Sequence, residues 1–369
     1  MHIQLPSEVA SPTSKQVPRS RLAPKLRNTE LMQFTQQITT LLVAGLTVLD
    51  AIRIFRGGQQ RPAALKLLTE LEYDLDNGLA LSQAIGAFPD SFDPLYWRLV
   101  SAGESSGTLE QTFNRLSFLL QRKHKLQQKV RTALMHPLAI AAVAFVVCAL
   151  LLVKVVPEFQ KMFGQFDQNL PALTLKVINL SHHLYDYGLV WTGAFVATAY
   201  ALRLTLRHHD ATKRLAHRLI LRAPFLGPLT SDACTARFAR TLVTGYSAGL
   251  PIITALDYAA AATGNCVFTH ATELTRSSID QGAELNVALS QTTQFPDLFI
   301  HMVAVGEQGG MLESMLQRAA EYYEARVDNT IDRLIPLLEP AMMVTLGGLV
   351  GGLMLAMYLP LFQMGSVLS

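Results

Sequence analysis

The chain has 369 residues, of which 50% are hydrophobic and only 16% are charged. A soluble globular protein is usually about a quarter charged, so this balance indicates a membrane protein. The formal net charge of +3 is too small for a general nucleic-acid-binding protein.

Residues 1–28 form a polar segment with four prolines and scattered lysines and arginines. No apolar stretch follows a charged start, so the segment lacks the pattern of a signal peptide. We expect a disordered tail. A solvated tail is a simpler interpretation than a segment bound to anionic lipid or to an acidic partner.

Residues 29–135 are predicted to form a first cytoplasmic helical domain. Gly45 is expected to end the first helix, and Asp76-Asn77-Gly78 and Phe88-Pro89-Asp90 are expected to form turns. Apolar residues recur at helical spacing on one face of that first helix: Leu31, Phe34, Ile38, Leu41 and Leu42.

Three stretches have the roughly 20 mainly apolar residues that a membrane-spanning helix needs. They are residues 136–156, 188–206 and 339–362. The middle of each is uncharged, and Lys154 lies near the end of the first, where its ammonium can reach the headgroups. A buried core helix is the competing interpretation of the second stretch.

The charges of the connecting segments predict an orientation. Lysines and arginines are concentrated before the first span and after the second, whereas residues 157–187 hold only two lysines and residues 363–369 none. By the positive-inside rule, the N-terminus and residues 207–338 are cytoplasmic. The loop at 157–187 and the tail at 363–369 are then periplasmic.

Residues 207–338 repeat the first cytoplasmic domain. Phe34 to Ala51 aligns with Phe238 to Ala255, 204 residues later, and both segments contain Ala-Gly-Leu. Further along, both domains contain Gly-Glu-x-x-Gly-x-Leu-Glu, and Pro137 and Pro340 each stand at the start of a predicted span. The sequence therefore predicts an all-α membrane protein with two homologous cytoplasmic helical bundles and three transmembrane helices.

These motifs resemble those of the F-protein family of type II secretion, which includes the equivalent PilC-type platform of type IV pilus machines. The resemblance rests on Phe-x(10)-Gly-Leu, a later Phe-Pro, and Gly-Glu-x-x-Gly-x-Leu, all present twice. The linker at 223–229 and Leu338-Glu339-Pro340 are also similar. His136 departs from the pattern, since the family commonly has an aromatic residue before the proline.

The resemblance implies a multi-pass platform in the bacterial inner membrane. Such a platform couples a cytoplasmic assembly ATPase to the incorporation of pilin or pseudopilin subunits, and it meets other platform subunits and further copies of itself. The oligomeric state, and the choice among secretion, pilus and competence systems, stay open at this point.

The repeated Gly-Glu segments are candidate partner-binding sites. The alternative is a structural helix corner, in which glycine frees the backbone, leucine enters the core and glutamate favours a helix N-terminus. If the glutamates are exposed, charge reversal should spare folding. The candidate residues are Gly103, Glu104, Gly107, Gly306, Glu307 and Gly310.

Other candidate sites are weaker. Glu110 and Asn114 lie one helical turn apart and could hold calcium, but two oxygen-bearing side chains are few for an ion that takes 6–8 ligands, so a solvated face is preferred. The three cysteines are expected to be free thiols. In the third span, four glycines at GxxxG spacing are expected to allow close helix packing: Gly347, Gly348, Gly351 and Gly352.

The sequence contains no Walker-type phosphate loop and no common nucleophile or metalloprotease motif. We therefore predict a protein that is not an enzyme and uses no cofactor. A small-solute transporter or channel component is the alternative function. That alternative would favour ionisable residues in the middle of the spans, which this chain lacks.

Overall fold

The computed structural model describes residues 25–155, 157–158, 210–224 and 226–367, and scattered positions between 175 and 200. Its described residues form helices and turns, without strands. Residues 1–24, most of the predicted loop at 157–187 and most of the predicted span at 188–206 lie outside the described residues. The three-span topology therefore stays a prediction.

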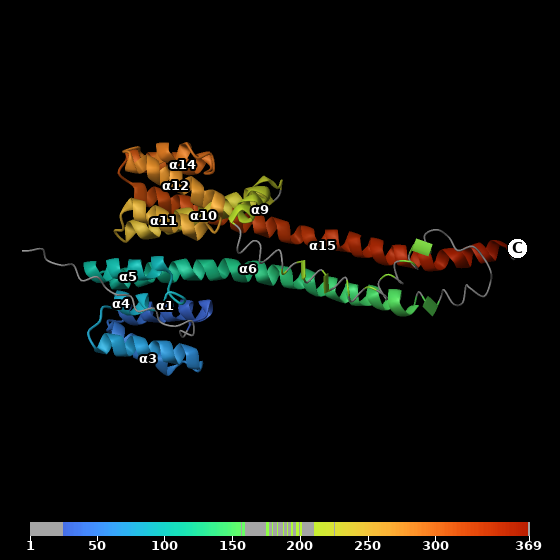
Figure 1. The fold of residues 1–369 in the computed structure, drawn as a ribbon, viewed down its shortest axis with the longest axis horizontal. Helices are drawn as coiled ribbons and strands as arrows, with labels where there is room; N and C mark the ends of the chain where they lie inside the picture. The colour runs from blue at the N-terminus through green and yellow to red at the C-terminus, as the bar shows by residue number, and fades with distance from the viewer. Residues whose placement is uncertain are drawn as a thin grey trace, which may run out of the picture. The chain divides into compact units, whose positions relative to one another are not determined.

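Apart from α9, the described helices of the two repeats match one another (Figure 1). The first repeat contains α1 (Asn28–Val43), α2 (Val48–Gly57), α3 (Pro62–Asp76), α4 (Leu81–Gly86), α5 (Pro94–Ser106) and α6 (Leu109–Leu150). The second contains α9 (Asp210–Arg222), α10 (Leu226–Ser247), α11 (Ile252–Thr263), α12 (Cys266–Asp280), α13 (Leu285–Ser290), α14 (Asp297–Gln308) and α15 (Leu312–Val367).

The helix bounds confirm the repeat. α3 and α4 begin 204 residues before α12 and α13, and α5 and α6 begin 203 residues before α14 and α15. The change in offset comes from a loop that is one residue shorter in the second repeat. The two Phe-Pro-Asp segments are not equivalent, because they lie 207 residues apart: Phe88 is the second residue after α4, whereas Phe295 lies two residues before α14 and corresponds to Phe92.

Aromatic rings form the core of the first repeat. Phe34 on α1 has its ring 5.3 Å from that of Phe55 and 5.9 Å from that of Phe92. The ring of Tyr96 lies 5.1 Å from Phe92 and 6.4 Å from Phe113 on α6. All five side chains are buried. Such rings contribute both buried area and favourable edge-to-face contacts, so they fix how α1, α2, α5 and α6 pack.

The second repeat keeps three rings of this core at equivalent positions, Phe238, Phe295 and Phe299, and adds two rings at other positions, Phe268 and Tyr323. Phe238 on α10 contacts Phe295 and Phe299, with ring centroids 4.7 Å and 5.9 Å away. Phe268 on α12 lies 5.4 Å from Phe295, and Tyr323 on α15 lies 6.4 Å from Phe299. Burial raises the pKa of the Tyr323 hydroxyl to about 12.

Each repeat continues into one long apolar helix. Among the described residues, Leu109–Leu150 and Leu312–Ala356 are long and apolar enough to cross a membrane. Their apolar parts carry exposed side chains such as Val143, Phe145 and Val344. Large apolar side chains that face outward along an uncharged part of a helix suit a lipid environment.

The two prolines do not begin new helices: the predicted spans at 136–156 and 339–362 continue the helices of the two repeats. α6 runs unbroken through Pro137, and α15 through Pro340. A proline removes one intrahelical hydrogen bond, but apolar membrane helices tolerate this loss by small local adjustments. A short π-helical turn, Leu151–Val155, follows α6.

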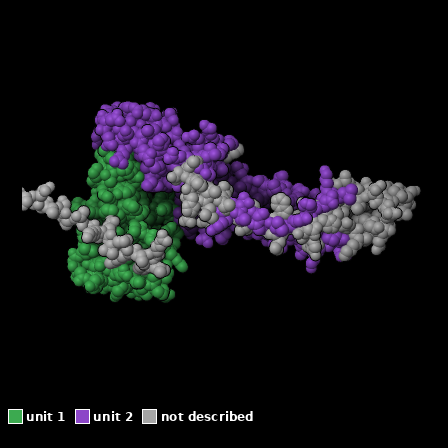
Figure 2. Space-filling model, in the orientation of Figure 1, with its two compact units in different colours: residues 1–124, 241–258 green, residues 125–240, 259–369 purple. Residues whose placement is uncertain are grey.

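The described chain forms two compact units, coloured in Figure 2. Unit 1 comprises residues 1–124 and 241–258, and unit 2 comprises residues 125–240 and 259–369. The units do not coincide with the predicted domains at 29–135 and 207–338, because the end of α10 and the start of α11 belong to unit 1.

Candidate functional site

The first Gly-Glu segment forms the corner between α5 and α6. Gly103 and Glu104 lie in the last turn of α5, and α6 begins at Leu109. Gly107 ends α5 with a φ of +71°, in the left-handed region that glycine adopts without strain. Gly310, at the equivalent position of the second repeat, is the second residue after α14 and has a φ of +65°.

Gly103 allows α5 and α6 to approach closely. A Cβ atom added at this position would lie 2.3 Å from Thr112 Oγ1 and 2.9 Å from Thr112 Cβ. At the equivalent Gly306, a Cβ atom would lie 3.0 Å from both Leu312 Cα and Met315 Cβ. The first glycine of each motif is therefore required by packing.

We expect Gly103→Ala to lower the free energy of unfolding by about 1–3 kcal/mol, because the added methyl group must push α5 away from α6. The thermal midpoint of the purified protein in detergent measures this loss. Gly57→Ala is the matched control, since a Cβ atom there meets nothing within 4 Å in the described structure. Equal midpoints for the two variants would contradict a packing role for Gly103.

Glu104 caps the N-terminus of another helix. Its Oε1 accepts a hydrogen bond from the backbone N–H of Leu81 at 2.7 Å. Its Oε2 accepts from the N–H and the hydroxyl of Ser82, at 3.2 Å and 2.7 Å. The N-cap residue of α4 is Ala80, whose side chain offers no acceptor. Glu104 thus replaces the missing cap from α5.

Glu307 repeats this arrangement in the second repeat. Its carboxylate accepts from the backbone N–H groups of Leu285 and Asn286 at 2.7 Å and 3.0 Å, and from the Asn286 side-chain amide at 2.7 Å. Both glutamates are half-buried. They are therefore not the free, exposed charges assumed from sequence, and charge reversal at either position removes a cap.

The leucines of the motif are also less buried than expected. Leu109 and Leu312 are partly buried where α6 and α15 begin, whereas Phe113 and Leu316, one turn later, are fully buried. Truncation of either motif leucine should therefore cost less than the truncation of a central core residue.

The weak calcium candidates lie on the surface of one helix. Glu110 and Asn114 are exposed on one face of α6. Among the described residues, no group of three or more His, Cys, Asp or Glu side chains is placed to hold a metal ion.

The three cysteines are free thiols, as expected. Cys148 and Cys234 are buried, and Cys266 is half-buried at the start of α12. Burial raises the pKa of the Cys234 thiol.

The glycine stripe of α15 is open. A Cβ atom added at any of the four positions would meet nothing within 4 Å among the described residues. The positions are Gly347, Gly348, Gly351 and Gly352. The predicted close packing of another helix against this stripe therefore stays a prediction.

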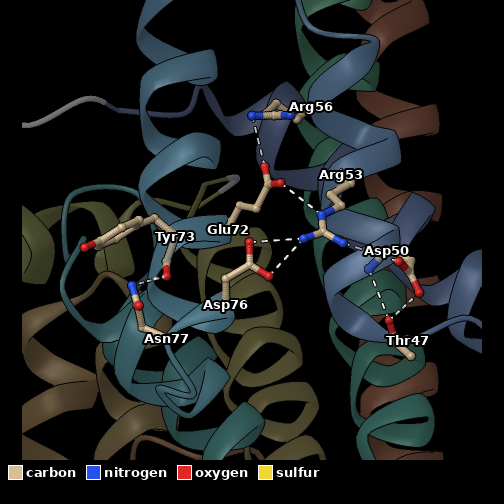
Figure 3. A network of polar contacts seen from close by, with 8 residues as sticks. All are labelled: Thr47, Asp50, Arg53, Arg56, Glu72, Tyr73, Asp76 and Asn77. Carbon is tan, nitrogen blue, oxygen red and sulfur yellow. Dashed lines mark hydrogen bonds and ion pairs between the residues drawn. The ribbon is translucent and has the colours of Figure 1, made fainter.

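A network of charges around the half-buried Glu72 joins α2 and α3 (Figure 3). Arg53 donates to Glu72 at 3.0 Å and to Asp76 at 2.9 Å, and Arg56 pairs with Glu72 at 3.0 Å. In the second repeat the positions of Arg53 and Glu72 are occupied by Asp257 and Arg276, with opposite charges. The network is thus not a feature that both repeats present to one common partner.

Sequence reasoning missed two ion pairs between α10 and α15. Arg240 donates to both oxygens of Glu324, at 2.7 Å and 2.9 Å, and to Gln317 at 2.9 Å. Asp232 pairs with Arg326 at 2.8 Å. Burial raises the pKa of the Asp232 carboxyl, and Arg326 partly offsets this effect. The partners are far apart in sequence, so no local pattern points to them.

Comparison with known proteins finds one family model that matches both repeats. The model of the family described as type II secretion system (T2SS), protein F, matches residues 34–157 and 238–360. Each match covers one repeat and the apolar helix that follows it.

Curated relatives align with almost the whole chain. Type IV pilus assembly protein PilC of Pseudomonas aeruginosa is 39% identical over 349 residues, which cover 94% of this chain and 92% of that protein. Type IV pilus assembly protein TapC of Aeromonas hydrophila is 36% identical, with coverages of 94% and 84%. Type II secretion system protein F of Aeromonas hydrophila is 30% identical, with coverages of 92% and 87%. The chain belongs to the family of type II secretion F proteins and type IV pilus PilC proteins.

Proposed function

We propose that this chain is the inner-membrane platform of a filament-building machine and couples a separate cytoplasmic ATPase to the incorporation of pilin-like subunits. It has three spans, with both repeats in the cytoplasm, and it hydrolyses no nucleotide itself. The glycine stripe of α15 is a suitable face for a pilin transmembrane helix or for another copy of the chain.

The continuity of α6 and α15 is the observation that carries this proposal. α6 has 42 residues, about 60 Å at 1.5 Å per residue, and it holds both core residues of the first repeat and the apolar membrane segment. α15 likewise holds core residues of the second repeat and the apolar segment that follows it. A movement of either repeat is therefore transmitted to its membrane helix without a flexible joint.

The pattern of identities favours a pilus system over a secretion system. The pilus-assembly relatives are 34–39% identical to this chain, and the secretion F proteins are 29–30% identical. In-frame deletion of the gene is expected to abolish surface pili, seen by electron microscopy, while pilin is still made. A deletion strain that keeps its pili and loses protein secretion would reassign the chain to the secretion system.

The topology can be tested with reporter fusions. Fusions after Phe166 and after Ser369 are expected to be periplasmic, and a fusion after Ser290 cytoplasmic, because the basic segments flank the first and second spans on one side. Paired alkaline phosphatase and fluorescent-protein reporters measure the location. A cytoplasmic C-terminus would contradict the three-span topology.

A further inference from the structure

The helix α9 has one side attached to its own unit. It contacts α12, and Nδ1 of His217 accepts a hydrogen bond from the backbone N–H of Cys266 at 3.1 Å. Burial, and secondarily the charge of Lys213, lower the pKa of His217. His217 therefore marks the side of α9 that faces the unit.

The opposite side of α9 carries leucines. At 100° per residue, Leu215 and Leu219 lie on the far side of the helix from His217. They are 61% and 62% exposed. Arg218 and Arg222, both exposed, lie beside them at a spacing of one turn. A helix that met only water would have polar side chains at these two positions.

The charge and location of α9 indicate what covers this side. α9 contains four lysines and arginines and a single acidic residue, Asp210 at its start. The segment follows the predicted span at 188–206 within a few residues, so its start is held close to the bilayer. In Figure 1, α9 lies beyond α12 on the side toward which α15 runs. A basic amphipathic helix that starts near a membrane span has the composition of an interfacial helix.

We propose that α9 lies in the headgroup layer of the cytoplasmic leaflet and binds anionic phospholipid. Leu215 and Leu219 enter the boundary of the acyl chains, and Arg218 and Arg222 reach the phosphates beside them. Because His217 attaches the other side of α9 to α12, this contact fixes the distance of the second repeat from the membrane. The proposal depends on the predicted second span and not on which filament the machine builds.

The test places a nitroxide on α9 of the full-length protein. A Leu219→Cys variant, made with the native cysteines replaced, is labelled and reconstituted in vesicles of phosphatidylethanolamine and phosphatidylglycerol. The rates at which the nitroxide collides with oxygen and with a water-soluble nickel complex then report how deep it lies in the bilayer. The label is expected to be accessible to oxygen and shielded from nickel. Leu274→Cys on α12 is the matched control, because Leu274 is 52% exposed and should stay accessible to nickel.

A charge variant tests the lipid preference. Arg218→Gln with Arg222→Gln is expected to lower the equilibrium constant for insertion of the label by roughly 30-fold in the same vesicles. Vesicles of phosphatidylcholine alone should give a similar loss without any mutation. A label at position 219 that is as accessible to nickel as the one at 274 would overturn the proposal. A label shielded from both reagents would also overturn it, because protein would then cover the leucines.

Discussion

Replacing Arg240 with alanine is expected to destabilise the second repeat by about 3–5 kcal/mol, because the Glu324 carboxylate then stays in place without its main partner. The two side chains are only 8% and 12% exposed, and Arg240 binds both carboxylate oxygens. The thermal midpoint in detergent should fall by on the order of 10 °C. Limited proteolysis of the cytoplasmic region should show the same loss.

Two further variants make this experiment specific. Arg318→Ala removes an exposed arginine from the same helix as Glu324 and should change stability by no more than about 0.5 kcal/mol. Arg240→Met combined with Glu324→Met removes both charges and keeps similar volume, so it should recover most of the lost stability. An Arg240→Ala variant as stable as Arg318→Ala would show that the ion pair contributes little.

The position of this pair allows its effects on stability and on function to be compared. It joins α10, in the core of the second repeat, to α15, which continues into the apolar membrane segment. If the platform transmits movement through α15, the Met/Met variant should restore pilus assembly together with stability. If the Met/Met variant restores stability but not pili, the charges of Arg240 and Glu324 are themselves needed for pilus assembly.

Features that depend on local sequence could be predicted. The repeat was visible because its spacing persists over whole helices, and Gly45 does end α1, with a φ of +84°. The apolar parts of α6 and α15 were predicted because about 20 consecutive apolar residues, in a chain with so few charges, are typical of a membrane helix.

Features that depend on tertiary contact could not be predicted. Glu104 reaches the start of α4, 23 residues earlier, and Arg240 reaches Glu324, 84 residues later. The unbroken course of α6 through Pro137, at the start of the predicted span, could not be predicted either, because a proline often ends a helix and apolar membrane helices tolerate it. The sequence shows that the glutamates recur in both repeats, but only the folded structure shows which groups each carboxylate contacts.

Each residue of the repeated Gly-Glu motif has a structural role. The first glycine permits close helix packing, the glutamate caps a preceding helix, and the second glycine takes the left-handed conformation that ends α5 or precedes α15. These roles account for the motif's presence in both repeats without any partner. Contact with the assembly ATPase stays a prediction. A test of it must distinguish the loss of a partner contact from the loss of stability that follows when the helix cap is removed.

Glu104→Ala is expected to lower the free energy of unfolding by about 2 kcal/mol, because it leaves the N–H groups at the start of α4 without their charged acceptor. Glu110→Ala is the control, since Glu110 is exposed in the first turn of α6 and should matter by less than about 1 kcal/mol. Thermal midpoints and pilus counts are measured together for both variants.

A second substitution then separates the two roles of Glu104. Ala80 is the N-cap residue of α4 and has the extended backbone, with a φ of −60° and a ψ of 142°, that a capping side chain requires. Adding Ala80→Asp to Glu104→Ala should restore about 1 kcal/mol of stability by supplying a local cap. If pili return together with stability, Glu104 is a structural cap. If stability returns and pili do not, the carboxylate itself contacts a partner, and the purely structural interpretation of the motif is wrong at this position.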